Sequence, residues 1–188
     1  FTSLPQIREI FPPGVQIVFA IDIDDTIFSP HSNQYMEGET TVMIIGQLVR
    51  AENTHVLICT SRPCQKSNRE ATGKTLERLN LGFNGSPFFI EGEEECEILD
   101  EARKPIAIID CNGIFCGGET KDHKDFETSF SLISGCLKGI AIRQLLAQTG
   151  KLGAGKEELL VVIIDDQEDQ VGSVVSELTS PGCENVKV

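Results

Sequence analysis

The chain has 188 residues, 40% of them hydrophobic, and its 29 acidic and 16 basic side chains give a formal net charge of −13. This composition excludes a globally disordered chain, and the length suits one domain or one domain with a small insertion. No run approaches the ~18 consecutive apolar residues of a membrane span, so we expect none. Nucleic-acid binding relies on cationic contacts with phosphates, so this acidic balance argues against a nucleic-acid partner.

The cysteines bear on the redox compartment. Seven are present, an odd number, and no two of them form a CxxC pair. Cys59 and Cys136 lie beside apolar or small residues, as ordinary core thiols do. We therefore expect reduced thiols and a cytoplasmic protein.

Apolar runs alternate with helical periodicities along the chain. Strands are predicted at Gln16–Ile21, Val56–Cys59, Pro87–Ile90, Leu159–Ile164 and Asn185–Val188, from apolar and β-branched runs. Helices are predicted at Thr40–Arg50, Ser67–Leu79 and Ser134–Gln148, where apolar residues recur at helical spacing. Alternating strands and helices predict an α/β fold with a mostly parallel sheet.

A hairpin is predicted in the middle of the chain. Asn112 and Gly113 separate the apolar runs Ile106–Ile109 and Ile114–Cys116, and Asn-Gly between two such runs is the strongest short hairpin signal. The charge run Glu91–Glu97 is expected to be a solvated loop.

The spacing of these elements suggests a division into core and insertion. Residues 26–56 have room for a flap and one helix, whereas residues 62–138 exceed what one helix and one strand require. We therefore expect residues 1–90 and 135–188 to form a core, and residues 91–134 to form a small cap or hairpin insertion.

Three predicted strands end in polar residues that can carry chemistry. The first runs into Asp22 and Asp24, the second into Thr60 and Ser61, and the strand Leu159–Ile164 into an acidic stretch that includes Asp165, Asp166 and Asp169. In parallel sheets, ligands bind at the carboxyl ends of the strands. We therefore expect these side chains to meet at one edge of the sheet.

The carboxylates predict a metal site. Asp22 and Asp24 are two residues apart, so in extended backbone both point to one side, where they would meet Asp165 and either Asp166 or Asp169. Two like charges 4 Å apart repel by about 4 kcal/mol at an effective dielectric constant of about 20. A cation must offset this repulsion, and carboxylate oxygens suit Mg²⁺.

The same residues suit phosphoryl transfer. An aspartate can act as a nucleophile toward phosphorus, and a second carboxyl group can protonate the leaving oxygen and later activate water. Thr60 offers a hydroxyl group to a phosphoryl oxygen. Lys138 offers a cation at the predicted start of a helix, after Gly135.

At these residues the sequence resembles the haloacid dehalogenase superfamily. Its four signatures occur in order: a strand followed by DxDxT, a strand ending in Thr, a Lys at a helix start and a strand ending in an acidic pair, here Asp22-Ile23-Asp24-Asp25-Thr26, Thr60, Lys138 and Asp165-Asp166. The resemblance covers about residues 16–188. It implies a three-layer, Rossmann-like α/β fold with a small cap or hairpin insertion.

The resemblance also implies roles for individual residues. Asp22 would be the nucleophile and Asp24 the general acid and base, while Thr60, Ser61 and Lys138 would bind the phosphoryl group. Magnesium would lie at Asp22, Asp24 and Asp165, the contact with Asp24 being through its backbone carbonyl. Both DD and DxxxD patterns occur in the family, so Asp166 and Asp169 both remain candidates for the last ligand.

The implied activity is a Mg²⁺-dependent phosphomonoester phosphatase. The second aspartate of the first signature favours a phosphatase over a dehalogenase. A small cap favours bulky substrates, phosphoproteins included, beside small phosphometabolites. The segment from Asn112 to Phe115, ahead of Lys138-Gly139, is similar to a bacterial branch that includes effectors secreted into host cells, which would change the expected location.

Two other classes of protein carry similar residues. A phospho-accepting receiver domain uses similar residues, but it places its acidic pair first and its Lys last, whereas here the acidic pair follows Lys138. A non-catalytic, haloacid dehalogenase-like module that binds a signalling partner would carry the same motifs. The sequence leaves this second alternative open, together with the oligomeric state.

Overall fold

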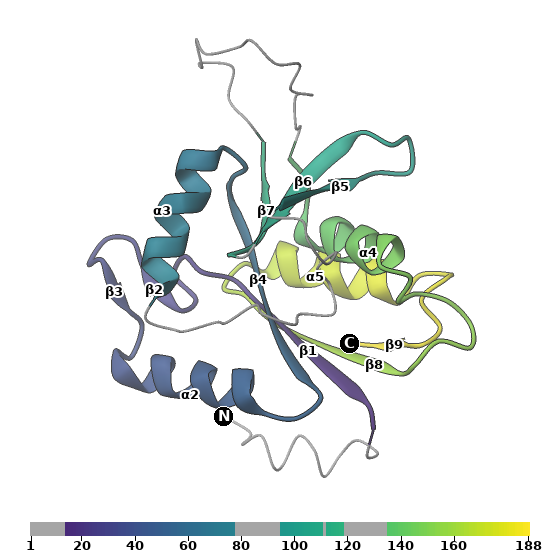
Figure 1. Cartoon of the computed structure of the whole chain (residues 1–188), viewed down its shortest axis with the longest axis horizontal. Coiled ribbons are helices and arrows are strands. Elements are labelled where there is room, and N and C mark those ends of the chain that lie inside the picture. The colour runs from purple at the N-terminus through teal and green to yellow at the C-terminus, as the bar shows by residue number, and fades with distance from the viewer. Residues whose placement is uncertain (1–13, 78–94, 111, 119–134) are drawn as a thin grey trace.

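A central sheet of seven strands organises the fold, which we describe from a computed structural model covering residues 14–77, 95–110, 112–118 and 135–188 (Figure 1). The strands lie in the order β5-β6-β7-β4-β1-β8-β9. The parallel strands are β1 (Gln16–Ile21), β4 (Thr54–Pro63), β7 (Gly113–Gly117), β8 (Leu159–Ile164) and β9 (Val186–Lys187). At one edge, β5 (Glu95–Leu99) and β6 (Pro105–Asp110) pair antiparallel. The predicted α/β class with a mostly parallel sheet is confirmed.

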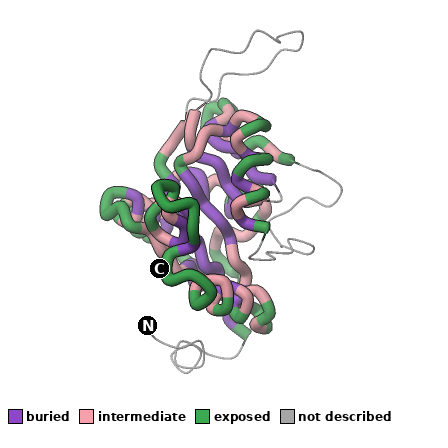
Figure 2. Tube along the Cα trace, turned by 90° about the vertical axis from the view of Figure 1, so that its left-hand side faces the viewer, coloured by how far each residue is buried: buried purple, intermediate pink, exposed green. Residues whose placement is uncertain are grey.

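Helices cover both faces of the sheet. Ile45 and Leu48 of α2 (Glu39–Arg50) and Leu76 of α3 (Lys66–Leu76) pack on one face. On the other face, α4 (Lys138–Gln148) and α5 (Glu168–Leu178) bury an apolar stripe against the sheet. The strands between these helices form the buried centre of the molecule (Figures 1 and 2). Such a layered arrangement is compatible with a Rossmann-like fold.

The register of the central strands sets where the candidate residues lie. Ile21, the last residue of β1, is aligned with Ile58 of β4 and with Ile164 of β8. The backbone N–H of Asp22 continues this pairing by donating to the Ile164 carbonyl at 2.9 Å. Because β1 lies between β4 and β8, its carboxyl end is where the strand order reverses, the usual ligand position in such sheets.

The predicted hairpin is present, and it belongs to the sheet. β6 and β7 pair antiparallel around the turn, with Asp110 opposite Gly113. Gly113 has a φ of 129°, and a Cβ atom there would lie 2.5 Å from the Ile58 carbonyl oxygen, so the turn requires glycine. The described residues of segment 91–134 therefore extend the sheet through β5, β6 and β7. The proposed division into core and insertion stays a prediction.

Some element boundaries differ from those predicted. Residues 95–97 of the charge run lie in strand β5 rather than in a loop, because Ile98 is buried in the core and fixes the edge strand. β4 continues past Cys59 to Pro63, with an irregular register after Thr60. α4 begins at Lys138 instead of Ser134, because Leu137 is extended. The expected strand Pro87–Ile90 falls outside the described residues.

A buried arginine joins α3 to the edge of the sheet. Arg69 donates from Nε to Oδ2 of Asp110 at 2.9 Å, and it also contacts the Glu95 carboxylate and the Cys64 carbonyl. Burial raises the pKa of Asp110, although hydrogen bonds from the Asn112 backbone and from Arg69 oppose that rise. Removing one partner of such a buried pair would leave an uncompensated charge. This contact therefore fixes α3 against β5 and β6.

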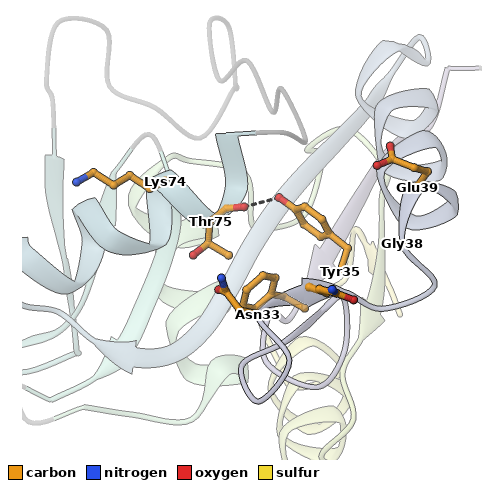
Figure 3. A pocket seen from close by; sticks show the side chains of 8 residues that line it. Asn33, Tyr35, Gly38, Glu39, Lys74 and Thr75 are labelled. Atoms are coloured by element: carbon orange, nitrogen blue, oxygen red, sulfur yellow. Dashed lines mark hydrogen bonds between the residues drawn. The ribbon is translucent and has the colours of Figure 1, made fainter.

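A short hairpin follows β1 and lies between α2 and α3. Strands β2 (Phe28–Ser29) and β3 (Gln34–Tyr35) pair antiparallel, and the rings of Phe28 and Tyr35 meet edge to face with centroids 5.7 Å apart. The Tyr35 hydroxyl donates to the Thr75 carbonyl near the end of α3 (Figure 3). This hairpin and α2 occupy the segment in which a flap and one helix are expected.

Candidate active site

Three charged side chains from distant parts of the chain meet at the carboxyl edge of the sheet. Nζ of Lys138, the first residue of α4, donates to Oδ1 of Asp22 at 2.5 Å and to Oδ2 of Asp165 at 2.6 Å. Lys138 is only 1% exposed, and the side chain of Asp165 is fully buried. The sequence places Asp22 after β1 and Asp165 after β8, so the parallel pairing of those strands brings their carboxylates together.

Burial and charge act on this group in opposite directions. Burial raises the pKa of Asp22, and the negative charge of Asp165 adds to the rise, while the hydrogen bond and charge of Lys138 oppose it. For Lys138, burial lowers the pKa, but the hydrogen bonds to Asp165 and Asp22 outweigh it and leave the pKa above its ordinary value. The ammonium group is therefore fixed in its charged form between two carboxylates.

A third carboxylate completes a cluster that can hold a cation. Ligand oxygens of Asp22, Asp165 and Asp166 all lie within 4.8 Å of one another. Three carboxylates against the single ammonium of Lys138 leave an excess of negative charge that a divalent cation can neutralise. All three are hard oxygen ligands, which fits Mg²⁺, Mn²⁺ or Ca²⁺ better than a thiophilic metal. The residues therefore fit a divalent ion, and they do not by themselves select magnesium.

Thr26, the last residue of the DxDxT signature, ties the loop after β1 to the loop after β8. Its hydroxyl oxygen accepts the backbone N–H of Asp166 at 3.1 Å and lies 3.4 Å from Oδ1 of the same residue. Asp165 is oriented in a similar way, because its Oδ1 accepts the backbone N–H of Gln167 at 3.0 Å. Hydrogen bonds thus hold both Asp165 and Asp166 in place.

Asp24 takes a different direction from the one expected. Its carboxylate accepts two hydrogen bonds from Arg62, from Nε at 2.8 Å and from Nη2 at 2.6 Å, and it does not belong to the three-carboxylate cluster. The prediction that Asp22 and Asp24 point to one side assumed extended backbone, but β1 ends at Ile21 and a tight turn follows, in which Asp25 has a φ of 60°. Asp24 therefore lies beyond the regular strand on which that prediction relied.

The other predicted site residues lie at or near the same edge. Thr60 is buried in β4, two residues past the Ile58 that pairs with Ile21, and its Oγ1 accepts the backbone N–H of Arg62 at 3.2 Å. Its hydroxyl proton remains able to donate to a ligand. Ser61 is exposed on β4. Asp169 lies in the first turn of α5, is exposed, and is not part of the carboxylate cluster.

Two residues that support the site carry no motif in the sequence. Arg62 follows Thr60 by two positions, and nothing local indicates that it reaches Asp24, 38 residues earlier in the chain. Gln170 is buried in α5, and its Oε1 accepts the backbone N–H of Lys138 at 3.0 Å, which fixes the start of α4. Neither contact can be recognised before the order of the strands is known.

Close packing of α4 on α5 also positions Lys138. A Cβ atom on the next residue, Gly139, would lie 2.3 Å from the carbonyl oxygen of Ser173 in α5. Only glycine allows this approach of the two helices. At the start of α4, Lys138 therefore supplies the cation, and Gly139 allows the close contact with α5 that positions it.

A separate pocket of about 560 Å³ lies beside the β2–β3 hairpin (Figure 3). It is lined by Phe28, Asn33, Gln34, Tyr35, Gly38, Glu39, Lys74 and Thr75, none of which was predicted as a site residue. In Figure 3 the side chains of Glu39 and Lys74 lie on opposite sides of the labelled group. None of the residues that line this pocket belongs to the three-carboxylate cluster.

Comparisons with known proteins do not supply a relative. No family model, curated protein or solved structure matches the chain. Among the described residues, no helix is both long and apolar enough to cross a membrane.

Proposed function

We propose that this chain is a Mg²⁺-dependent phosphatase that hydrolyses phosphomonoesters through a phosphorylated Asp22, as in the haloacid dehalogenase superfamily that its sequence resembles. The observation that carries the proposal is the contact of buried Lys138 with Asp22 and Asp165 at the carboxyl edge of the sheet, with Asp166 within reach. A buried nucleophile, a fixed cation and a cation-binding acidic pair are the parts that phosphoryl transfer requires.

The proposed reaction has two steps. A carboxylate oxygen of Asp22 attacks phosphorus, the bond from phosphorus to the ester oxygen breaks, and the carboxylic acid of Asp24 gives its proton to the departing oxygen. Asp24 then takes a proton from a water molecule, which attacks the same phosphorus. The bond between phosphorus and Asp22 breaks, inorganic phosphate leaves, and both aspartates return to their starting states.

The surrounding charges support this sequence of steps. The ammonium group of Lys138 is almost completely excluded from water. In this buried position its attraction for a phosphoryl oxygen is stronger than it would be in bulk solvent. When bound by Asp22, Asp165 and Asp166, a magnesium ion supplies positive charge that offsets the charge of the phosphoryl group. The hydroxyl group of Thr60 provides a further donor.

The exposure of the two aspartates is consistent with their proposed roles. The side chain of Asp22 is 5% exposed, whereas that of Asp24 is 35% exposed. The proposed acid is therefore more exposed than the proposed nucleophile, which suits a group that protonates a departing alcohol. An open approach of this kind suits a bulky leaving group, so we include phosphopeptides among the proposed substrates beside small phosphometabolites.

Hydrolysis of p-nitrophenyl phosphate by the full chain tests the proposal. We expect turnover with Mg²⁺, none after chelation, and none for the Asp22→Asn variant, whose fold is checked by circular dichroism. Glu168→Gln is the matched control, because Glu168 is exposed at the start of α5 and should leave turnover unchanged. Turnover by the Asp22→Asn variant would show that Asp22 is not the nucleophile. Magnesium binding without turnover on any phosphomonoester would favour the non-catalytic binding module.

A further inference from the structure

Three cysteine thiols gather next to the candidate active site. They come from β4, β7 and the residue two before α4, and we call Cys59, Cys116 and Cys136 the thiol cluster. The sulfur atoms of Cys59 and Cys116 are 3.8 Å apart. The thiols of Cys116 and Cys136 lie near enough for each to shift the pKa of the other. The backbone also joins the last pair, since the N–H of Cys136 donates to the Cys116 carbonyl at 2.9 Å.

The members of the thiol cluster differ in access to solvent. Cys59 and Cys116 are buried, at 0% and 2% exposure, whereas Cys136 is only partly buried. A reagent arriving from solvent therefore meets Cys136 first. Cys116 is more deeply buried and lies next to Cys136, so it can react with an oxidised form of Cys136.

The environment of Cys136 favours its thiolate. The hydrogen bond from the Cys116 thiol, together with one from the backbone N–H of Ala141 in the first turn of α4, lowers the pKa of Cys136 against the opposing effect of burial. The pKa of Cys116 is raised, through its bonds to the two neighbouring thiols and through burial. The thiolate is the reactive form of cysteine, and a position near the N-terminus of a helix favours it. Buried cysteines with a raised pKa are unreactive toward reagents in solvent.

We propose that Cys136 is a site of oxidation by hydroperoxides and that Cys116 resolves the product as an intramolecular Cys116–Cys136 disulfide. The Cys136 sulfur attacks one oxygen of the peroxide, the O–O bond breaks, and a sulfenic acid forms while the second oxygen leaves as water or an alcohol. The Cys116 sulfur then attacks the Cys136 sulfur, and the sulfenic oxygen leaves as water with the proton from Cys116. Two thiols lose two electrons, and one peroxide gains them.

The disulfide would act on the candidate site through the start of α4. Cys136 precedes Lys138 by two residues, and the backbone N–H of Lys138 is already fixed by Gln170. A disulfide draws two sulfur atoms to about 2.05 Å and restrains the dihedral angles on both sides. This shifts the residues that lead into α4 and with them the Lys138 ammonium between Asp22 and Asp165.

Peptide mapping of the reduced full chain after graded hydrogen peroxide tests the oxidation itself. Free thiols are then alkylated, and linked peptides are identified by mass spectrometry. We expect a Cys116–Cys136 linked peptide to form first and to disappear on reduction. Cys136→Ser should slow the loss of the Cys116 thiol by at least about tenfold. Cys96→Ser is the matched control, because Cys96 is also partly buried but lies on β5, and it should not alter the pattern.

Three outcomes of the mapping would overturn the proposal. They are a first disulfide that uses another cysteine, such as Cys111, which lies outside the described residues; oxidation of Cys136 to sulfinic acid with the Cys116 thiol intact; and loss of thiols only after unfolding in urea. The mapping does not depend on the proposed phosphatase. A second measurement, loss of phosphatase turnover in step with the disulfide and its recovery on reduction, rests on that function. An inactive reduced chain that still forms the disulfide would reject the phosphatase and retain the oxidation site.

Discussion

Arg62 holds the carboxylate of Asp24 through two parallel hydrogen bonds, from Nε at 2.8 Å and from Nη2 at 2.6 Å. The remaining guanidinium nitrogen, Nη1, donates to Oγ1 of Thr72 at 2.9 Å, so the fork is fixed from α3 as well. The side chains of Arg62 and Asp24 are 20% and 35% exposed, and ion pairs with this exposure contribute little to stability. The contact therefore matters chiefly because it fixes the direction of the Asp24 carboxylate.

The first prediction concerns this positioning. Arg62→Lys keeps the charge but loses the two-pronged geometry. We expect hydrolysis of alkyl phosphates, whose leaving groups need a proton, to slow by about 10²-fold. Hydrolysis of p-nitrophenyl phosphate should change much less, because p-nitrophenolate leaves without protonation. Steady-state rates on both substrates check this. Thr72→Val, which removes only the outer support, should show the same selectivity in weaker form, whereas equal losses on both substrates would contradict the assignment.

The second prediction separates the two candidates for the last metal ligand. Asp166 belongs to the three-carboxylate cluster and Asp169 does not. Asp166→Asn should raise the Mg²⁺ concentration for half-maximal effect at least about tenfold, since affinity follows the number of charged ligands. Asp169→Asn should leave it unchanged. Magnesium titration by calorimetry measures this without reference to activity. The reverse ranking would place the ion nearer to α5.

The third prediction concerns pH in the absence of metal. Burial raises the pKa of Asp22 above its ordinary value of 3.8, so ionisation of Asp22 is less favourable in the folded state than in the unfolded chain. The stability associated with the neutral form is fully present below pH 3.8 and is lost as the pH rises through the higher folded value. The metal-free Asp22→Asn variant should therefore melt higher than the natural chain at neutral pH, and the difference should vanish in acid. Calorimetric melting temperatures across this range check the sign.

The fourth prediction compares two glycines of adjacent helices. Gly139→Ala places a methyl group against the Ser173 carbonyl and should destabilise the fold by about 1–3 kcal/mol. A Cβ atom on Gly172 of α5 meets nothing within 4 Å, so Gly172→Ala should be neutral or stabilise by about 0.5–1 kcal/mol through helix propensity. Urea denaturation of both variants measures the contrast. If both changes had the same effect, close packing of α4 on α5 would not be the cause.

The strands that the sequence marks most strongly are those whose burial is nearly continuous. β1 and β8 are largely apolar runs of six residues whose side chains are all buried or partly buried. Their composition alone therefore predicts buried strands. Helix α5 is absent from the predicted elements, although Val171, Val174 and Leu178 have helical spacing, because the acidic residues at its start resemble a ligand-bearing loop. The charge run Glu91–Glu97 predicts a solvated loop, but its residues 95–97 belong to edge strand β5, where the Glu95 side chain pairs with Arg69.

The candidate site was predictable to the extent that it follows from strand ends. Asp22, Asp165 and Lys138 are brought together by the parallel order of the sheet, which the motifs anticipate. The direction of Asp24 depends on the turn that begins after Ile21 and on a partner from β4, Arg62, and no pattern in the sequence specifies either. Side-chain direction outside regular structure is set by tertiary contacts, so it could not be derived from residue spacing.

The separation in sequence between Lys138 and its partner Asp22 has a consequence for how the chain matures. The two residues are 116 positions apart, and Asp165 joins them from β8, close to the end of the chain. Closing loops of this length makes such contacts slow to form, so the acidic edge can be complete only after the last parallel strands have docked. During refolding, recovery of metal affinity should therefore lag behind recovery of helical signal, and fragments that end before β8 should never acquire it.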